Sequence, residues 1–182
     1  MDGFISGFDT DVLYLDYSRA FDRVDHEILL TKLKIYRISD KCIKWIDNFL
    51  SNRYQVVKVN GSKSYSSLVK SGVPQGTVIG PLLFVIFIND IPSPSSGSTV
   101  ETFADDTKIS RKIESYHDMA SLQNDLEKIV SWSLGNNMKL NDKKFQLIIH
   151  RGSPPSQLLQ SLPFDLQGSM YTMRDKTDLE AT

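Results

Sequence analysis

The sequence predicts an α+β fold in which helices back an antiparallel sheet. Short β-prone segments alternate with longer stretches in which apolar residues recur at helical spacing. Two regions, residues 54–69 and 99–110, have turn residues at their centres, and such hairpins join antiparallel strands. The 182 residues, 40% of them hydrophobic, supply enough apolar surface for the core of one domain.

One strand and two helices are expected first. Val12–Leu15 is a run of four apolar residues that ends at Asp16, which indicates a strand buried on both faces. Asp25 stands where a helix N-cap is expected, and a second helix is predicted over residues 40–52. The side chains of that second helix expected to face inward are Ile43, Ile46, Phe49 and Leu50.

A hairpin, a loop and a buried helix should follow. Residues 54–69 have the pattern of a hairpin with Asn60-Gly61 at its turn. Residues 71–81 form a glycine-rich loop, and Pro81 falls near the first turn of the next helix. That helix, residues 82–90, is apolar almost all round and is therefore expected to be buried.

A second hairpin, a helix and a last strand complete the pattern. The second hairpin joins Thr99–Ala104 to Thr107–Ser110 through a tight turn that carries Asp105 and Asp106. An amphipathic helix is predicted between about Met119 and Gly135, followed by a strand at 145–150. No regular structure is predicted beyond Arg151.

The overall charge is nearly balanced but is unevenly distributed. There are 22 acidic and 21 basic residues, so the net charge gives no general sign of nucleic-acid binding. Residues 31–63, however, hold eight basic and two acidic side chains. Composition alone favours a solvated helix face there, and the alternative is a local surface that faces phosphates.

The chain is expected to be intracellular, in the cytoplasm or nucleus. Its single cysteine, Cys42, excludes an internal disulfide and suggests a reducing compartment. The longest apolar run, Leu82–Ile88, is far shorter than the roughly 20 residues that cross a bilayer. No secretory signal is recognised at the start of the chain, and no membrane partner is expected.

Three aspartates are the strongest candidates for chemistry. Asp16 ends the first strand, while Asp105 and Asp106 lie in the second hairpin, so an antiparallel sheet can bring them to one place. Converging carboxylates repel one another, and a divalent cation removes that repulsion. Mg²⁺ takes oxygen ligands and serves phosphoryl transfer, whereas an Asp-Asp pair alone is often only solvated turn chemistry.

Four motifs resemble those of reverse transcriptases from LINE-type retrotransposons, which lack long terminal repeats. Leu15–His26 resembles motif A, and Ser71–Phe84, continuing to Ile91, resembles motif B. Phe103–Asp106 matches the aromatic-X-Asp-Asp box of motif C, and residues 132–144 are similar to motif D. The resemblance covers about residues 10–150 in the right order and spacing. It implies a reverse-transcriptase palm.

The resemblance also implies a metal site. Asp16 and Asp105 take the places of the family's metal-binding aspartates, and Asp106 that of its third catalytic acid. The backbone carbonyl of Tyr17 becomes a further metal ligand by the same comparison. Two Mg²⁺ ions are implied, with Mn²⁺ as a possible substitute.

Further residues are implied to contact the incoming nucleotide. Phe21 matches the aromatic gate under the sugar, although it can equally be a core side chain. Lys144 matches a group that protonates or neutralises the departing pyrophosphate, although a solvated lysine is as good an interpretation. A plain turn is the alternative for the motif B loop, whose implied nucleotide contacts are Gly72, Pro74, Gln75 and Gly76.

Departures from the family pattern predict a palm fragment. Motif A begins close to the first residue, so the fingers region that precedes it in the family is expected to be missing. Residues 151–182 only faintly resemble the run toward the primer grip, with Glu180 where the family has glycine, and Phe145 stands where motif D usually has threonine. We therefore expect a palm domain over residues 1–150, a degenerate and partly disordered segment over 151–182, and no thumb.

The expected function is RNA-directed DNA polymerisation within a retrotransposon protein, by two-metal transfer of nucleotides to a primer 3′-hydroxyl. As a truncated fragment, the chain is expected to be only weakly active. The implied partners are an RNA template, a DNA primer, deoxynucleoside triphosphates and the rest of the retroelement polyprotein. Two alternatives are a catalytically silent remnant that is at most RNA-binding or structural, and another two-metal enzyme such as a nucleotide cyclase. The Pro-Gln-Gly loop and the Phe-Ala-Asp-Asp box argue against the cyclase.

Overall fold

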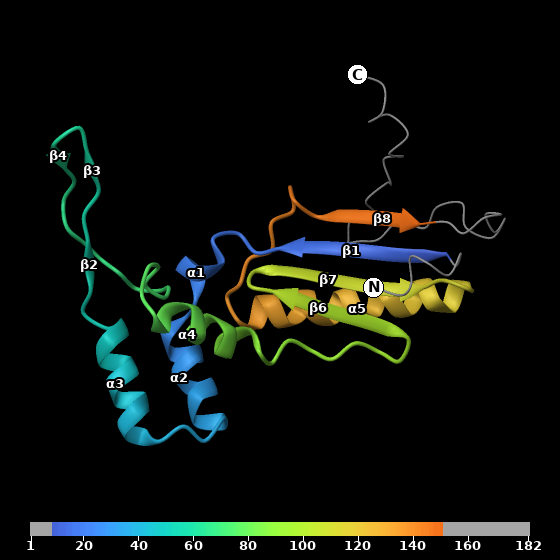
Figure 1. Cartoon of the computed structure of the whole chain (residues 1–182), viewed down its shortest axis with the longest axis horizontal. Coiled ribbons are helices and arrows are strands. Elements are labelled where there is room, and N and C mark those ends of the chain that lie inside the picture. Colours follow the sequence, from blue (N-terminus) through green and yellow to red (C-terminus); the bar gives the residue numbers. More distant parts are fainter. Residues whose placement is uncertain (1–8, 151–182) are drawn as a thin grey trace. The chain divides into compact units, whose positions relative to one another are not determined.

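The computed structural model describes residues 9–150, which form two compact units (Figure 1). The sheet unit comprises residues 9–16, 92–132 and 140–150, and the helical unit comprises 17–91 and 133–139. The predicted segment 151–182 lies outside the described residues. The predicted fold class is confirmed, because an antiparallel sheet and helices make up the described chain.

The sheet unit contains four antiparallel strands. They are β1 (Thr10–Asp16), β6 (Ser98–Phe103), β7 (Asp106–Lys112) and β8 (Gln146–His150). Their order across the sheet is β6-β7-β1-β8, so β1 has a partner on each side. Val12, Leu13 and Leu15 of β1 are buried, as the apolar run predicts for a central strand, but Tyr14 of the same run is 38% exposed, so the prediction of a strand buried on both faces is wrong at this residue.

Helix α5 (Tyr116–Gly135) runs along one face of this sheet (Figure 1). Its buried residues Met119, Leu122, Leu126 and Ile129 recur every three or four positions, which places them on one face of the helix. Arg111 of β7 ties the two layers together because its guanidinium donates to Asp118 of α5 at 2.9 Å. The predicted helix is confirmed, and it begins before Met119.

A buried carboxylate anchors the loop before β6. Asp125 of α5 accepts hydrogen bonds from the backbone N–H of Ser95 at 2.9 Å, from the Ser95 hydroxyl at 2.6 Å and from Lys128 at 2.9 Å. Burial alone would raise the pKa of Asp125, but the hydrogen bonds from Ser95 and Lys128 outweigh it and hold that pKa below its ordinary value.

Asp125→Ala is expected to lower the free energy of unfolding by about 2–4 kcal/mol, because it leaves the Ser95 donors without their charged acceptor. Since the folded pKa is lowered, this stabilisation is present above the ordinary aspartate pKa near 4 and is lost as the pH falls through the folded value. Urea unfolding at neutral and acid pH measures both effects. The exposed Asp142→Ala is the control, and an equal loss in both variants would contradict the assignment.

The helical unit begins with three helices. They are α1 (Ala20–Arg23), α2 (His26–Ile35) and α3 (Asp40–Leu50). The predicted N-cap is confirmed, since the Asp25 carboxylate accepts from the backbone N–H of Ile28 at 3.1 Å. In α3, Ile43, Ile46 and Leu50 are buried as predicted. Phe49, which is also predicted to face inward, is only half-buried, and its ring stacks on that of the exposed Trp45 one turn earlier.

The predicted hairpin at 54–69 is confirmed as a long arm of four short strands. They are β2 (Tyr54–Gln55), β3 (Lys58–Val59), β4 (Ser62–Lys63) and β5 (Ser67–Leu68). β2 pairs with β5 and β3 with β4, and the turn is formed by Asn60-Gly61. Both turn residues have positive φ, 47° and 84°, as the tight hairpin turn requires.

Helix α4 (Ile79–Ile88) follows the glycine-rich loop, with Pro81 in its first turn as predicted. Leu83, Phe84 and Phe87 are buried, but Leu82 and Val85 are 56% and 52% exposed. The expectation of a helix buried all round is therefore wrong, because only one side of α4 is covered by the described residues.

A buried lysine connects α2 to the end of α4. The Lys32 ammonium donates to the backbone oxygen of Phe87 at 2.7 Å and to Asp90 at 2.6 Å. Burial lowers the pKa of Lys32, while the hydrogen bond and charge of Asp90 oppose that shift. The charge is thus satisfied at the C-terminal end of α4, where carbonyl oxygens lack helical partners.

Candidate active site

Two of the three predicted aspartates are direct neighbours in the sheet. Asp16 is the last residue of β1 and Asp106 the first of β7, and the two are paired across the strands. Residues paired in this way place their side chains on the same face, with Cβ atoms about 4.5–5.5 Å apart. Asp106 is exposed, so solvent and ligands reach it.

Asp105 lies in the turn that joins β6 to β7. Phe103 pairs with Asp106, which leaves Ala104 and Asp105 as the two turn residues. The prediction that Asp105 and Asp106 share the turn is therefore wrong by one position, because the ladder extends to Asp106. Ala104 has φ of 52°, a conformation that costs a non-glycine residue about 1–2 kcal/mol. Such strain is concentrated at functional turns.

Two residues of the motif D segment hold the Asp16 carboxylate. The Lys144 ammonium donates to Asp16 Oδ1 at 3.0 Å, and the Asn141 amide donates to Oδ2 at 3.1 Å. The backbone N–H of Asn141 also donates to the carbonyl oxygen of Asp16 at 2.8 Å. The segment before β8 is thereby fastened to the end of β1.

The three carboxylates together raise the pKa of Lys144. Its hydrogen bond to Asp16 is the main cause that raises the pKa of Lys144, and the charge of Asp16 adds to it. The charges of Asp106 and Asp105 raise this pKa further. A single exposed cation therefore interacts with all three aspartates, which makes this end of the sheet a place that favours positive charge.

The aspartates provide the hard oxygen ligands that Mg²⁺ prefers, so the chemistry of the donor set fits a divalent cation. Nevertheless, among residues 9–150 no three carboxylate, imidazole or thiol groups lie close enough together to hold a metal ion. The backbone pairs Asp16 with Asp106, but their side chains and that of Asp105 do not come together as a set of ligands around one point. The predicted metal ligands therefore remain a prediction.

The predicted nucleotide-contacting residues of motifs A and B lie in the helical unit. The N–H of Gly72 donates to the Val24 carbonyl oxygen at 2.8 Å, and the N–H of Val73 donates to that of Phe21 at 2.8 Å. The Ser71 hydroxyl donates to the carbonyl oxygen of Asp22 at 2.8 Å. The start of the motif B loop is thus bound to the chain around α1.

The positions of Gln75, Pro74 and Gly76 follow from this attachment. The Gln75 amide lies 3.4 Å from the Asp22 carboxylate, a weak hydrogen bond. The carbonyl oxygen of Pro74 accepts from the Thr77 hydroxyl at 2.7 Å. Gly76 has φ of 77° and open space where a side chain would be, so a ligand can approach its backbone.

Phe21 is half-buried and packs on α4. Its ring is stacked on that of Phe84, with centroids 4.3 Å apart and planes inclined by 18°. Phe84 is fully buried, so it holds the Phe21 ring in one orientation. Tyr17, whose backbone carbonyl is the predicted metal ligand, has a buried side chain.

Two residues were missed by sequence reasoning. Asn141 supports Asp16, and Asp22 receives both Ser71 and Gln75. Asp22 lies within motif A and Asn141 within motif D, so the motifs identified the segments but not these two residues. The contacts themselves are separated by 125 positions for Asn141 and 49 for Ser71, and no local pattern indicates them.

Comparison with known proteins is consistent with this geometry. The family described as "Reverse transcriptase (RNA-dependent DNA polymerase)" matches residues 8–170. The probable RNA-directed DNA polymerase from transposon X-element of Drosophila melanogaster is 30% identical over 159 residues, covering 83% of this chain and 17% of that protein. The RNA-directed DNA polymerase from mobile element jockey of the same species is 34% identical over 139 residues, covering 72% and 15%.

Solved structures share the fold. A telomerase from Candida tropicalis, truncated from its C-terminal domain, aligns with a TM-score of 0.58 at 12% identity and covers 78% of this chain and 31% of that one. Telomerase from Candida albicans aligns with a TM-score of 0.59 at 14% identity and covers 89% of this chain and 29% of that one.

The chain spans less than a fifth of the length of the two Drosophila relatives. Within residues 9–150, no helix is both long and apolar enough to cross a membrane.

Proposed function

Because the chain belongs to the reverse transcriptase family, we propose that it is the catalytic palm segment of a retrotransposon RNA-directed DNA polymerase. Its substrates would be deoxynucleoside triphosphates, a DNA primer and an RNA template. The observation that supports this most directly is the end of the sheet, where Asp16 is paired with Asp106 and Asp105 occupies the adjoining strained turn.

The three aspartates are proposed to hold two Mg²⁺ ions, which Mn²⁺ can replace. When bound, such ions lower the pKa of the attacking primer hydroxyl and neutralise the charge that develops on the phosphates. Asp16 and Asp105 are the proposed principal ligands, with Asp106 and the carbonyl of Tyr17 as further ones. Asn141 is a positioning residue, because its amide orients the carboxylate of Asp16.

Lys144 is proposed to act on the leaving pyrophosphate. It is exposed and, like any lysine of ordinary pKa, protonated at neutral pH; the hydrogen bond to Asp16 raises its pKa further. In the structure its ammonium pairs with Asp16, and it would exchange this partner for a phosphate oxygen when substrate binds. It then either donates a proton or offsets the negative charge there.

The helical unit supplies the proposed sugar and nucleotide contacts. Phe21, held by Phe84, offers a rigid ring to fill the space that a ribose 2′-hydroxyl would need. Gln75 and the backbone at Gly76 are exposed on the loop that is fastened to α1. A polymerase must accept any base sequence, so binding of template and primer rests mainly on phosphates.

Thermal unfolding with and without Mg²⁺ tests the metal site. A ligand that binds only the folded state at about 100 times its dissociation constant adds about 2.7 kcal/mol, or roughly 5–10 °C in melting temperature for a chain of this size. We expect this rise for the wild-type chain and its loss in Asp105→Asn. The exposed Asp40→Asn, which removes the same charge from α3, is the control. An equal rise in melting temperature with Mg²⁺ in all three proteins would mean that Asp105 does not bind the metal.

A further inference from the structure

The hairpin arm, residues 53–70, belongs to a stretch of the chain that contains no acidic residue. No aspartate or glutamate occurs between Asp47 and Asp90, although the whole chain has 22 acidic residues among 182. All the charges within that stretch lie on the arm and are positive: Arg53, Lys58, Lys63 and Lys70. The arm therefore carries a local charge that the nearly neutral composition of the whole chain hides.

Two of these lysines are held side by side. Lys58 of β3 and Lys63 of β4 are paired across the strands next to the Asn60-Gly61 turn. Two like charges directly opposite each other destabilise a hairpin. Both are exposed, and neither forms an ion pair with any residue between 9 and 150. An anion bound between them would convert this repulsion into attraction.

The arm also exposes aromatic and branched apolar side chains. Tyr65 is 98% exposed and Tyr54 68%, and every residue from 54 to 68 is exposed. Val57 and Val59 are 63% and 61% exposed. A two-stranded hairpin is only marginally stable in water on its own, and exposed apolar groups of this kind mark interaction surfaces.

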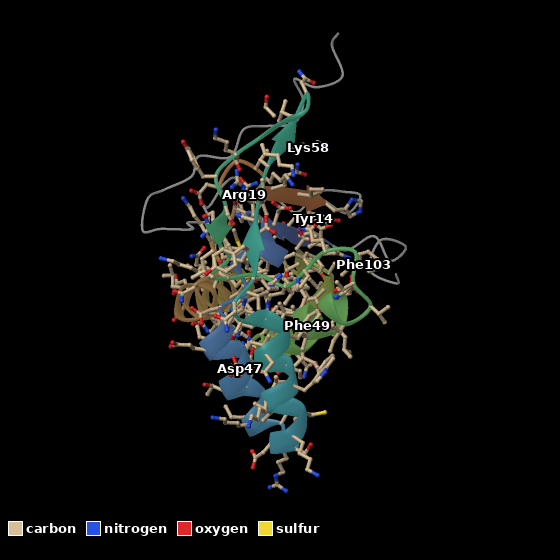
Figure 2. All side chains as sticks on the ribbon, turned by 90° about the vertical axis from the view of Figure 1, so that its left-hand side faces the viewer. Tyr14, Arg19, Asp47, Phe49, Lys58 and Phe103 are labelled. Carbon is tan, nitrogen blue, oxygen red and sulfur yellow. The ribbon has the colours of Figure 1, made fainter. Side chains whose placement is uncertain are left out.

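The base of the arm is fixed to the helical unit. Arg53 donates from Nε to the Leu50 carbonyl oxygen at 2.9 Å and from Nη2 to that of Gly72 at 2.9 Å. Figure 2 shows Lys58 on the arm, well away from Asp47 and Phe49 of α3. Arg53 therefore serves as the anchor, which leaves Lys58 and Lys63 near the tip and the exposed Lys70 at the base to meet a ligand.

From this arrangement we propose that the hairpin arm binds single-stranded nucleic acid, with Lys58 and Lys63 on the phosphates and Tyr54 and Tyr65 stacked on bases. Cations with exposed aromatic rings are the combination that holds single strands without regard to sequence. Unpaired bases expose the faces that tyrosine rings require, whereas a duplex buries them. None of these residues belongs to the proposed active site, so the arm adds a second contact to the proposed polymerase.

Fluorescence anisotropy of the full chain with a labelled single strand tests the arm. The probe is an unstructured oligouridine of about 12 nucleotides, a length typical of single-strand sites, in buffer with EDTA so that the metal site cannot contribute. Oligothymidine and a duplex of the same length are compared. We expect both single strands to bind more tightly than the duplex.

Two matched double variants distinguish binding by the arm from a general effect of positive charge on the affinity. The double variant Lys58→Gln/Lys63→Gln is expected to weaken binding about tenfold and to reduce the slope of log K against log salt by about 1.4, or about 0.7 for each phosphate that is no longer neutralised. Tyr65→Ala is expected to weaken binding about fivefold or more, because one base no longer stacks on a ring. The control Lys34→Gln/Lys41→Gln removes the same charge from exposed positions of α2 and α3 and should change the affinity less than twofold.

Three results would overturn the proposal. They are the absence of single-strand binding, an equal loss of affinity in the two lysine double variants, and tighter binding of the duplex. A protein partner on the arm would give the first of these results. This outcome and that of the metal test are distinguishable, because the affinity for single strands is measured in EDTA, whereas the Mg²⁺ response is measured by thermal unfolding without nucleic acid.

Discussion

Asp16→Asn and Asp105→Asn are each expected to lower DNA synthesis on an RNA template by about a thousandfold or more. A metal ion that stabilises the transition state contributes several kcal/mol, and each 1.36 kcal/mol is tenfold in rate. Asparagine keeps the size of the side chain and removes the charge that holds the ion. Asp106→Asn should have a smaller effect, because Asp106 is proposed as the less tightly bound third acid.

Primer extension by a chimaera measures this effect. The segment matching the jockey polymerase, 34% identical over 139 residues, replaces its counterpart in that protein, which supplies the remaining length of the enzyme. Asp40→Asn on α3 is the control for loss of one acidic charge and should retain the activity of the unmutated chimaera. An active chimaera in which Asp105→Asn extends primers at the unmutated rate would exclude Asp105 from catalysis.

Gly72→Ala is expected to cost about 2–5 kcal/mol of unfolding free energy, the sum of an unfavourable φ and an overpacked contact. Gly72 has φ of 89°, and a Cβ atom there would lie 2.8 Å from Asp22 Cα and 2.9 Å from its carbonyl oxygen. These are backbone atoms and cannot rotate away. The hydrogen bonds of Gly72 with Val24, His26 and Arg53 prevent the loop from moving outward.

The matched control is Gly61→Ala in the turn of the hairpin arm. Gly61 also has positive φ, 84°, but no atom lies within 4 Å of the position where its Cβ would be. It should therefore cost only the backbone strain of about 1–2 kcal/mol. Chemical denaturation followed by circular dichroism compares the two variants. Equal costs would mean that the contact between Gly72 and Asp22 is not tight in solution.

The element types and the motifs could be predicted from the amino-acid sequence alone. Periodicity of two and of 3.6 residues is a local property, so the strand that ends at Asp16, the N-cap at Asp25 and the Asn60-Gly61 turn were all predicted from neighbouring residues. The family was likewise recognisable, because the order and spacing of its motifs are properties of the chain itself.

Which residues meet could be learned only from the folded chain. Strand register depends on pairing between distant segments. It placed Asp106 opposite Asp16 in the ladder, so that Ala104 and not Asp106 shares the turn with Asp105. Burial depends on what covers a surface, so the uniformly apolar α4 still exposes Leu82. Hydrogen bonds across more than a hundred positions joined Asn141 and Lys144 to Asp16, and no local pattern encodes a partner that far away.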